Sequence, residues 1–266
     1  MTDPMITTIY GPKFTAKSSI ALTWPTPIAY YDLELGGPRA WKWKQLVDAG
    51  KALRPRRVSI PVKSLTKRWA KLEGHIQAWI DLQELLEKDY EDDAIQTIVF
   101  DTGTKIRQMA IDSFLEFRQN QAGDRDKKTL DVSEYAEPNR RTEETMTGPK
   151  RAGKNLVVVY HDTDEYLPKL DEDGKVVKDA AGNIIREQTG KRIPDGYKQA
   201  GDDSDWILWT SMEVRKYTNA KGVETRGPVP TAEVYKSPYG LDFFGKKWDW
   251  ATYEMVMEGP RALGRV

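Results

Sequence analysis

The chain has 266 residues, of which 39% are hydrophobic and 31% charged, and this composition is typical of a folded domain with a well-solvated surface. Lys plus Arg and Asp plus Glu number 41 each, and the net charge of zero argues against a protein that coats nucleic acid by bulk charge alone. The absence of cysteine excludes disulfides and thiolate chemistry, and since no apolar run reaches the roughly 18 residues of a membrane span, we expect a cytoplasmic protein without membrane contact.

The N-terminal quarter of the chain begins with two expected strands. These are residues 5–10, "MITTIY", and 27–34, "PIAYYDLE", both short runs rich in β-branched and aromatic residues. A brief helix is expected between them at 17–24, where a following proline ends it. Further on, 64–90 carries an apolar stripe whose members recur every three or four residues, as on one face of a helix: Leu65, Trp69, Leu72, Ile76, Trp79, Leu82 and Leu86.

The middle of the chain changes character twice. Residues 94–101, "AIQTIVFD", are almost wholly apolar and predict a strand covered on both faces, with a helix after it at 104–117. Residues 118–154 are polar and poor in large aliphatic side chains, which predicts a long loop. Two further strands are expected at 155–162 and 205–211, and two hairpins at 174–187 and 213–227.

Strands that alternate with helices predict an α/β fold, with a mainly parallel sheet flanked by helices and β-hairpin decoration in the C-terminal half. We expect a single domain over residues 1–266. Its parts would be a core of about 5–165 and 204–257, the polar loop 118–154, and a hairpin insertion of about 166–203.

Residues 10–19, "YGPKFTAKSS", have the spacing of a phosphate-binding loop, although a surface turn before a short helix is the plainer alternative. Such a loop aims backbone N–H groups and a helix N-terminus at the phosphates. Gly11, Lys17 and Ser18 fit the pattern G-x-x-x-x-G-K-[ST], in which the lysine reaches the β- and γ-phosphates and the hydroxyl ligates magnesium. Ala16 departs from the pattern, because its Cβ lies where the backbone approaches the phosphate most closely.

Three later segments carry the other groups that a nucleotide site needs. Asp101 ends a buried strand, where a carboxylate can orient the water shell of magnesium. Asp32 and Glu34 lie two apart in an expected extended segment and so share a face, from which Glu34 can activate an attacking water. His161 follows another strand, where a polar side chain can sense the γ-phosphate. Singly, each has a plainer interpretation as a strand-ending acid, a solvated turn or a structural histidine.

With these segments in this order, the chain resembles the RecA-like P-loop ATPases, and more closely the AAA-type ATP-binding proteins of bacteriophages, including the Sak-type single-strand annealing ATPases. The resemblance is carried by "IYGPKFTAKSS", "IAYYDLELGGPR", "TIVFDT" and "LVVVYHD" and covers residues 5–165. It implies a RecA-like P-loop fold, ATP and Mg²⁺ as ligands, and a homo-oligomer. The implied function is a DNA-linked ATPase that binds or anneals single-stranded DNA in phage recombination or replication.

The resemblance also implies a role for each matching residue. Glu34 falls on the catalytic glutamate, and His161 lies where RecA-like proteins carry a glutamine and many phage proteins a histidine. With Lys17, these are the expected catalytic residues. Ser18 and Asp101 are the expected magnesium ligands, Asp101 through water. The nucleotide is expected to contact the loop residues Gly11, Pro12, Lys13, Phe14, Thr15, Ala16, Lys17, Ser18 and Ser19.

The loop departs from the family at three positions, Ala16, Lys13 and Phe14, where glycine or small residues are usual. We therefore expect hydrolysis that is slow or depends on DNA or an oligomer. The same departures motivate an alternative function, a degenerate P-loop scaffold or DNA-annealing module with little or no hydrolysis. A nucleotide kinase is a third alternative. The lack of an arginine-rich lid in the sequence argues against it.

Single-stranded DNA has modest support from the residues themselves. Basic clusters occur at 51–57, 140–141, 150–154 and 246–247. Bases stack on aromatic rings near such clusters, and the candidates here are Trp41, Trp43 and Trp248. A solvated face for the charges and a core position for the tryptophans are the alternatives. The residues of the 118–154 loop expected to contact DNA are Arg140, Arg141, Lys150 and Arg151.

Overall fold

A mixed sheet forms the centre of the computed structural model, which describes residues 3–48, 53–61, 71–179, 181–196, 200–218 and 222–262. The strands are β1 (Ile6–Gly11), β2 (Ile28–Asp32), β3 (Leu53–Arg56), β4 (Thr97–Asp101), β5 (Asn155–Pro168), β6 (Arg186–Pro194), β7 (Trp206–Thr218), β8 (Glu224–Lys236) and β9 (Lys247–Asp249). The helices are α1 (Lys17–Ala21), α2 (Trp41–Asp48), α3 (His75–Glu91), α4 (Gly103–Gln119), α5 (Ala136–Arg151), α6 (Ala200–Asp203) and α7 (Tyr253–Ala262), with 3₁₀ turns η1 (Gly37–Arg39), η2 (Val132–Tyr135) and η3 (Gly240–Asp242).

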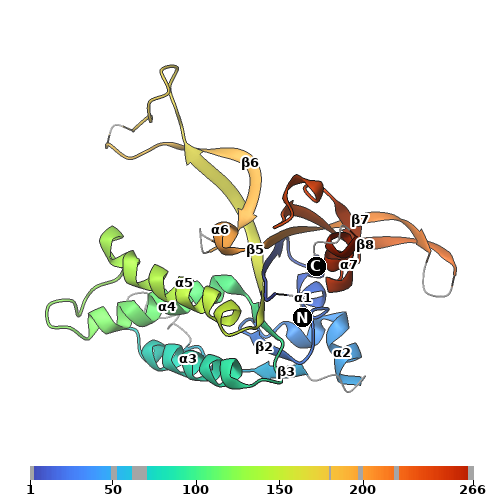
Figure 1. The fold of residues 1–266 in the computed structure, drawn as a ribbon. Helices are drawn as coiled ribbons and strands as arrows, with labels where there is room; N and C mark the ends of the chain where they lie inside the picture. The colour runs from blue at the N-terminus through green and yellow to red at the C-terminus, as the bar shows by residue number, and fades with distance from the viewer. Residues whose placement is uncertain are drawn as a thin grey trace.

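The sheet runs in the order β3-β2-β4-β5-β1-β7-β8-β9, with β6 paired to β5 outside this path (Figure 1). From β3 to β7 along this order all neighbours are parallel, whereas β8 and β9 are antiparallel additions. This topology confirms the predicted mainly parallel sheet flanked by helices. Because parallel strands end at one edge, Gly11 lies beside His161 and Asp32 lies beside Asp101.

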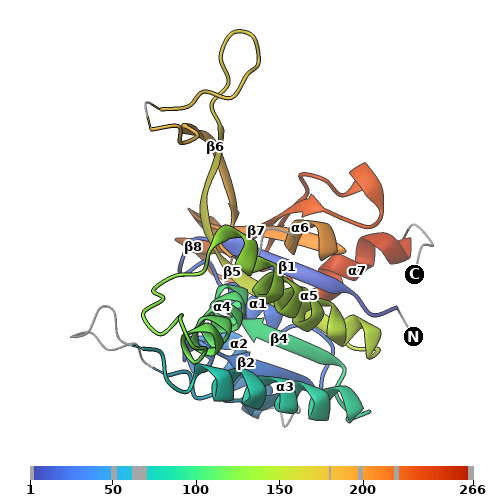
Figure 2. The same ribbon diagram turned by 90° about the vertical axis from the view of Figure 1, so that its left-hand side faces the viewer.

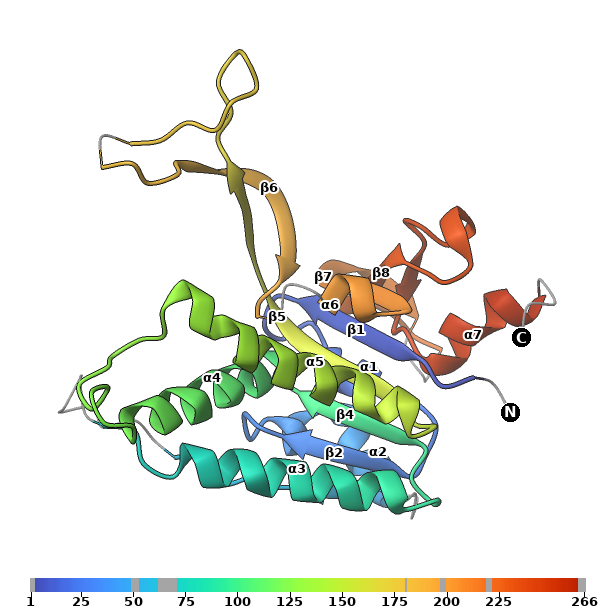
Figure 3. The ribbon, with the colours of Figure 1, turned by 60° about the vertical axis from the view of Figure 1, so that its left-hand side comes forward.

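Helices cover both faces of the sheet (Figure 3). One core joins α1, α2 and α7 to the sheet, and a second core joins α3, α4 and α5 to the other face. In β4, Val99 belongs to the first core, while Ile98 and Phe100 belong to the second. A strand packed on both faces needs apolar side chains in both directions, which explains the unbroken apolar run in this segment.

The long helix predicted over 64–90 is shorter in the structure. It begins at His75, after Gly74 in a left-handed conformation (φ 82°), and residues 62–70, with the predicted stripe members Leu65 and Trp69, lie outside the described residues. Leu72 is buried, but it precedes the helix and packs in a small separate cluster. The stripe prediction holds within α3, where the following members face the core: Trp79, Leu82 and Leu86.

The prediction of a loop over residues 118–154 is wrong, because α5 occupies much of that segment. A capping box between Asp131 and Glu134 starts the η2 turn that leads into α5. The helix buries small or flexible side chains in place of aliphatic ones, and these are Pro138, Thr142, Thr145, Met146 and Pro149. Ion pairs one turn apart further stabilise its exposed face.

The predicted hairpin at 174–187 forms the tip of a longer arm. β5 continues past the sheet and pairs with β6, and the two strands extend away from the body (Figure 1, Figure 2). At the tip, two turns repeat one design, in which the carboxylates of Asp171 and Asp179 accept backbone N–H bonds. The second predicted hairpin is confirmed as β7 and β8. Within the described residues, none of the helices combines the length and apolarity needed to cross a membrane.

Candidate functional site

The loop between β1 and α1 is fixed by contacts with β7. A Cβ on Gly11 would lie 2.3 Å from the carbonyl oxygen of Thr210, so the strand can pass there only as glycine. The Thr15 hydroxyl donates to the Pro12 carbonyl at 2.8 Å and lies 2.6 Å from the Thr210 hydroxyl. The loop therefore has a defined shape before any ligand arrives.

Lys17 is buried at the start of α1 and folds back under the loop. Its Nζ donates to the carbonyl oxygens of Gly11 at 2.8 Å and Pro12 at 2.5 Å. Burial lowers the pKa of Lys17 to about 8, an effect that the charge of Asp101 opposes. An ammonium held only by carbonyl dipoles gains strongly from an anion beside it, because burial removes the water that would otherwise solvate its charge.

Ser18 and Asp101 come together from α1 and the end of β4. The Ser18 hydroxyl donates to Oδ2 of Asp101 at 2.6 Å, and the Tyr30 hydroxyl donates to the same oxygen. Burial raises the pKa of the Asp101 carboxyl, while these two hydrogen bonds lower it. A hydroxyl and a carboxylate fit Mg²⁺, which binds through one or two protein oxygens together with phosphates. The described residues hold no cluster of three or more acidic or histidine side chains that would cage a metal alone.

Glu34 and His161 meet across the sheet edge. His161 Nε2 lies 3.0 Å from Glu34 Oε2, and the Thr102 hydroxyl donates to Glu34 Oε1 at 3.4 Å. Asp32 instead stabilises the turn that follows β2, because its carboxylate accepts hydrogen bonds from the N–H groups of Gly36 at 2.8 Å and Gly37 at 3.1 Å. The expectation that Asp32 and Glu34 share a face is wrong, because β2 ends at Asp32 and the chain bends there.

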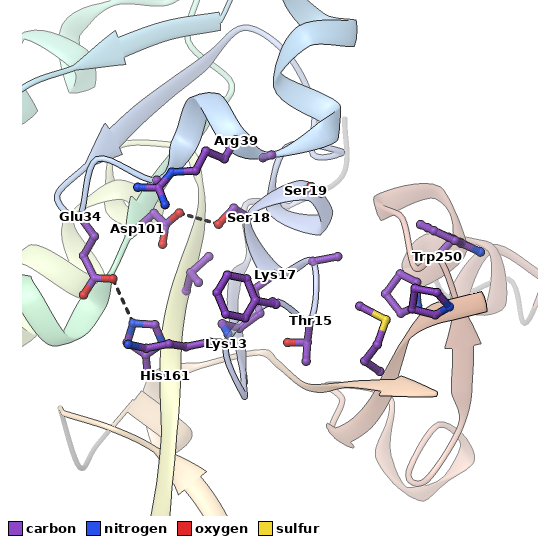
Figure 4. Close-up of a pocket in the computed structure, with 18 residues that line it drawn as sticks. Lys13, Thr15, Lys17, Ser18, Ser19, Glu34, Arg39, Asp101, His161 and Trp250 are labelled. Atoms are coloured by element: carbon purple, nitrogen blue, oxygen red, sulfur yellow. Dashed lines mark hydrogen bonds and ion pairs between the residues drawn. The ribbon is translucent and has the colours of Figure 1, made fainter. Parts of the chain in front are cut away.

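One cavity of about 600 Å³, a volume typical of ligand sites, is lined by Lys17, Ser18, Glu34, Asp101 and His161 (Figure 4). In Figure 4, Glu34, Asp101 and His161 lie on one side of Lys17 and Trp250 lies on the other. Of the predicted nucleotide contacts, the cavity brings together Lys13, Phe14, Thr15, Ala16, Lys17, Ser18 and Ser19. Gly11 and Pro12 are not among its lining residues and contribute the carbonyls that hold the lysine.

Two parts of this lining were not among the predicted site residues. Arg39, in the η1 turn, faces the cavity, and its guanidinium donates to the Leu35 carbonyl at 3.3 Å. No carboxylate within the described residues pairs with it. The segment "GGPR", which follows the acidic end of the second strand, is the sequence signal that could have identified it. The other part comes from the C-terminal strands and has no local sequence signal: Met212, Pro228, Pro230 and Trp250.

The residues predicted to contact DNA are largely occupied. In the clusters at 140–141 and 150–154, Arg140 and Arg141 pair with glutamates one turn away on α5, Lys150 pairs with Asp205 at 2.8 Å, and Arg151 donates to a threonine hydroxyl. The 51–57 and 246–247 clusters are also engaged through Arg54, Arg56, Lys246 and Lys247. Trp43 and Trp248 are partly buried and pack against the first core. The side chain of Trp41 and residues 51 and 52 lie outside the described part of the chain.

Ala16 adopts the backbone conformation that favours glycine, with φ 63° and ψ 16°. The loop has therefore kept its shape while losing the residue that adopts it without strain. We expect Ala16→Gly to bind ATP several-fold more tightly, because the Cβ lines the cavity. Folded stability should change by less than about 1 kcal/mol, since relief of strain offsets the greater chain entropy of glycine. Calorimetric titration and thermal unfolding measure the two effects.

Ala16→Val is the matched variant in the opposite direction. A β-branched side chain at positive φ is more strained than alanine, so both affinity and melting temperature should fall. Equal ATP affinity in Ala16→Gly and the wild type would show that the Cβ does not obstruct the ligand.

A family model described as an AAA domain matches residues 3–199, which cover β1 to β6 and the site residues from Lys13 to His161. No curated protein matches the chain.

Proposed function

Because the chain belongs to the AAA domain family, a class of P-loop ATPases, we propose that it binds ATP with Mg²⁺ in the cavity beside Lys17 and hydrolyses it. The observation that carries the proposal is that a buried lysine, the Ser18–Asp101 pair and the Glu34–His161 pair line the same cavity. Phosphate ligands and an attacking water have their partners in one cavity.

Each group in the cavity has a separate role in the proposed reaction. Lys17 exchanges its carbonyl partners for β- and γ-phosphate oxygens, and Arg39 adds a second cation at the same end. Ser18 and Asp101 would hold Mg²⁺, which when bound neutralises charge on the phosphate oxygens. Glu34 accepts a proton from a water whose oxygen attacks the γ-phosphorus, while the bond to the bridging oxygen breaks to release ADP. His161 keeps Glu34 in position.

The degenerate-scaffold alternative rests on the substitutions at Ala16, Lys13 and Phe14. Against it, Phe14 and Ala16 both adopt left-handed conformations, with φ values of 65° and 63°. The loop thus retains a backbone course that costs energy in a non-glycine residue, which argues for a working phosphate site. Tight Mg²⁺-dependent ATP binding without phosphate release would favour the scaffold.

We also propose that the protein binds single-stranded DNA. The expected DNA contact is the arm formed by β5 and β6, in place of residues 118–154. β5 passes His161 at the cavity and continues without a break into the arm, so a shift at the nucleotide can travel along one strand. Three exposed arm cations, Lys178, Arg186 and Lys191, have no acidic partner within the described residues. The phage setting, a role in recombination or replication, and a homo-oligomer stay predictions from the resemblance.

Phosphate release with and without single-stranded DNA tests this function. The wild type should release phosphate from ATP, faster with DNA. An arm variant with Lys178→Ala, Arg186→Ala and Lys191→Ala should keep the basal rate but bind DNA about tenfold or more weakly, with a smaller salt dependence. Arg140→Ala with Arg141→Ala is the matched control on α5, where the cations are paired. DNA binding lost in the α5 variant and kept in the arm variant would contradict the proposal.

A further inference from the structure

The end of the cavity opposite Glu34 is an apolar platform built by the C-terminal strands. Met212 on β7 and Pro228 and Pro230 on β8 line it, and Trp250, just after β9, closes it. Met212 pairs with Pro230 across the two strands, which places both at the same level of the sheet. The platform therefore belongs to a part of the chain that the family match does not include.

Trp250 is held in an unusual position for a large aromatic residue. Its backbone has φ 51°, in the left-handed region, and its N–H donates to the Pro230 carbonyl at 2.9 Å. The side chain remains 40% exposed, and Met212 remains 39% exposed. Strain and exposed apolar surface both cost free energy, and such features persist where a ligand covers them.

We propose that this platform binds the base of the nucleotide by stacking and that it distinguishes adenine from guanine only weakly. The proposal rests on the proposed ATP site, because the phosphates bound at Lys17 direct the rest of the ligand either toward Trp250 or toward Glu34. The Glu34 side holds charged groups that suit phosphate chemistry. The apolar side suits an aromatic ring, since base–aromatic stacking accepts every base.

Weak discrimination follows because the platform offers few polar groups that could read the edges of a base. Within the described residues of the lining, the platform presents methionine, proline and tryptophan side chains, whose one strong hydrogen-bonding group is the indole N–H of Trp250. Pro228 and Pro230 have no backbone N–H, so this stretch of β8 offers no donor there. Among the lining hydroxyls, that of Thr15 is engaged with Pro12 and Thr210, and that of Ser18 donates to Asp101.

The test is calorimetric titration, in the presence of Mg²⁺, of ATP, GTP and inorganic tripolyphosphate against the full chain. Wild type should bind ATP and GTP within about threefold of each other and both more tightly than tripolyphosphate. Trp250→Ala should weaken ATP and GTP roughly 5- to 150-fold, the range of one stacking contact, and leave tripolyphosphate unchanged. Trp250→Phe should restore most of the loss. Phe244→Ala, an exposed aromatic outside the cavity lining, is the matched control and should have no effect.

Each other outcome overturns a defined part of the inference. Equal binding of tripolyphosphate and ATP to wild type would show that the base contributes nothing, while the phosphate site stands. A Trp250→Ala variant that loses tripolyphosphate as well as ATP would show a structural defect in place of a base contact. A preference above tenfold for ATP over GTP would overturn the weak discrimination. If wild type binds none of the three ligands, the proposed function fails, and the base platform fails with it.

Discussion

Lys17→Ala should abolish ATP-dependent phosphate release and weaken Mg²⁺-ATP binding by about 30-fold or more. The buried ammonium is the one lysine lining the cavity that the fold removes from water, since Lys13 on the same loop is exposed. Truncating one member of a buried, hydrogen-bonded charge pair costs about 2–5 kcal/mol, and the triphosphate would be the other member. Phosphate release and calorimetric titration measure the two effects.

Lys13→Ala provides the matched control. It removes the same charge from the same loop, but from an exposed side chain, so binding should change by only a few-fold. A Lys17→Ala protein that still releases phosphate at the wild-type rate would contradict the assignment of the site. Carbonyl groups of Gly11 and Pro12 lose their donor in this variant, so thermal unfolding should be compared as well.

The pH dependence gives a readout that a purely structural lysine would not share. The folded-state pKa of Lys17, about 8, lies below its ordinary value of 10.5, so folding favours the neutral amine between these two values. Folded stability from this group therefore rises as pH increases from about 8 to 10.5. Nucleotide binding has the opposite sign, because phosphate needs the ammonium form. ATP affinity should fall above pH 8 in the wild type, and this fall should be absent in Lys17→Ala.

The order of the site residues along the chain could be predicted because each depends on local pattern. Short β-branched runs identify parallel strands, and the polar residue that ends each run must reach the same sheet edge. Asp101 and His161 are predicted by this rule, and Lys17 and Ser18 by the spacing of the loop after the first strand. The structure brings all four to one cavity. The conformation of Ala16 was not predictable, because a residue type does not show that its backbone is held at positive φ by neighbours.

The missed features depend on contacts between distant segments. α5 buries threonine, proline and methionine, so its sequence shows no aliphatic stripe. Its arginines look like a free basic cluster in the sequence, although in the structure they pair with glutamates. Trp250 reaches the cavity only because β8 and β9 pair beside β7, which no local pattern indicates. The β5–β6 arm was assigned as an insertion after the core, whereas its first strand is continuous with the core strand that carries His161.

Glu34→Gln should reduce phosphate release by about 100- to 10,000-fold, the usual contribution of a general base, while Mg²⁺-ATP binding changes by less than a few-fold. The amide keeps the size of the side chain and can still accept the bond from Thr102, now 3.4 Å from Glu34 Oε1, but it cannot take a proton from water. The variant should therefore accumulate with ATP bound. Single-turnover phosphate release and calorimetric titration separate the two effects.

Two comparisons make this result specific to Glu34. Asp32→Asn changes a carboxylate two residues away that accepts N–H bonds from Gly36 and Gly37, so turnover should stay within a few-fold of the wild type. His161→Ala removes the partner 3.0 Å from Glu34 and should slow release less than Glu34→Gln. If His161 acts by positioning Glu34, the double variant should be no slower than Glu34→Gln alone, because residues that act as one unit are not additive. Multiplied losses in the double variant would assign His161 an independent contact with the γ-phosphate, and a Glu34→Gln protein with near-normal turnover would move the base elsewhere in the cavity.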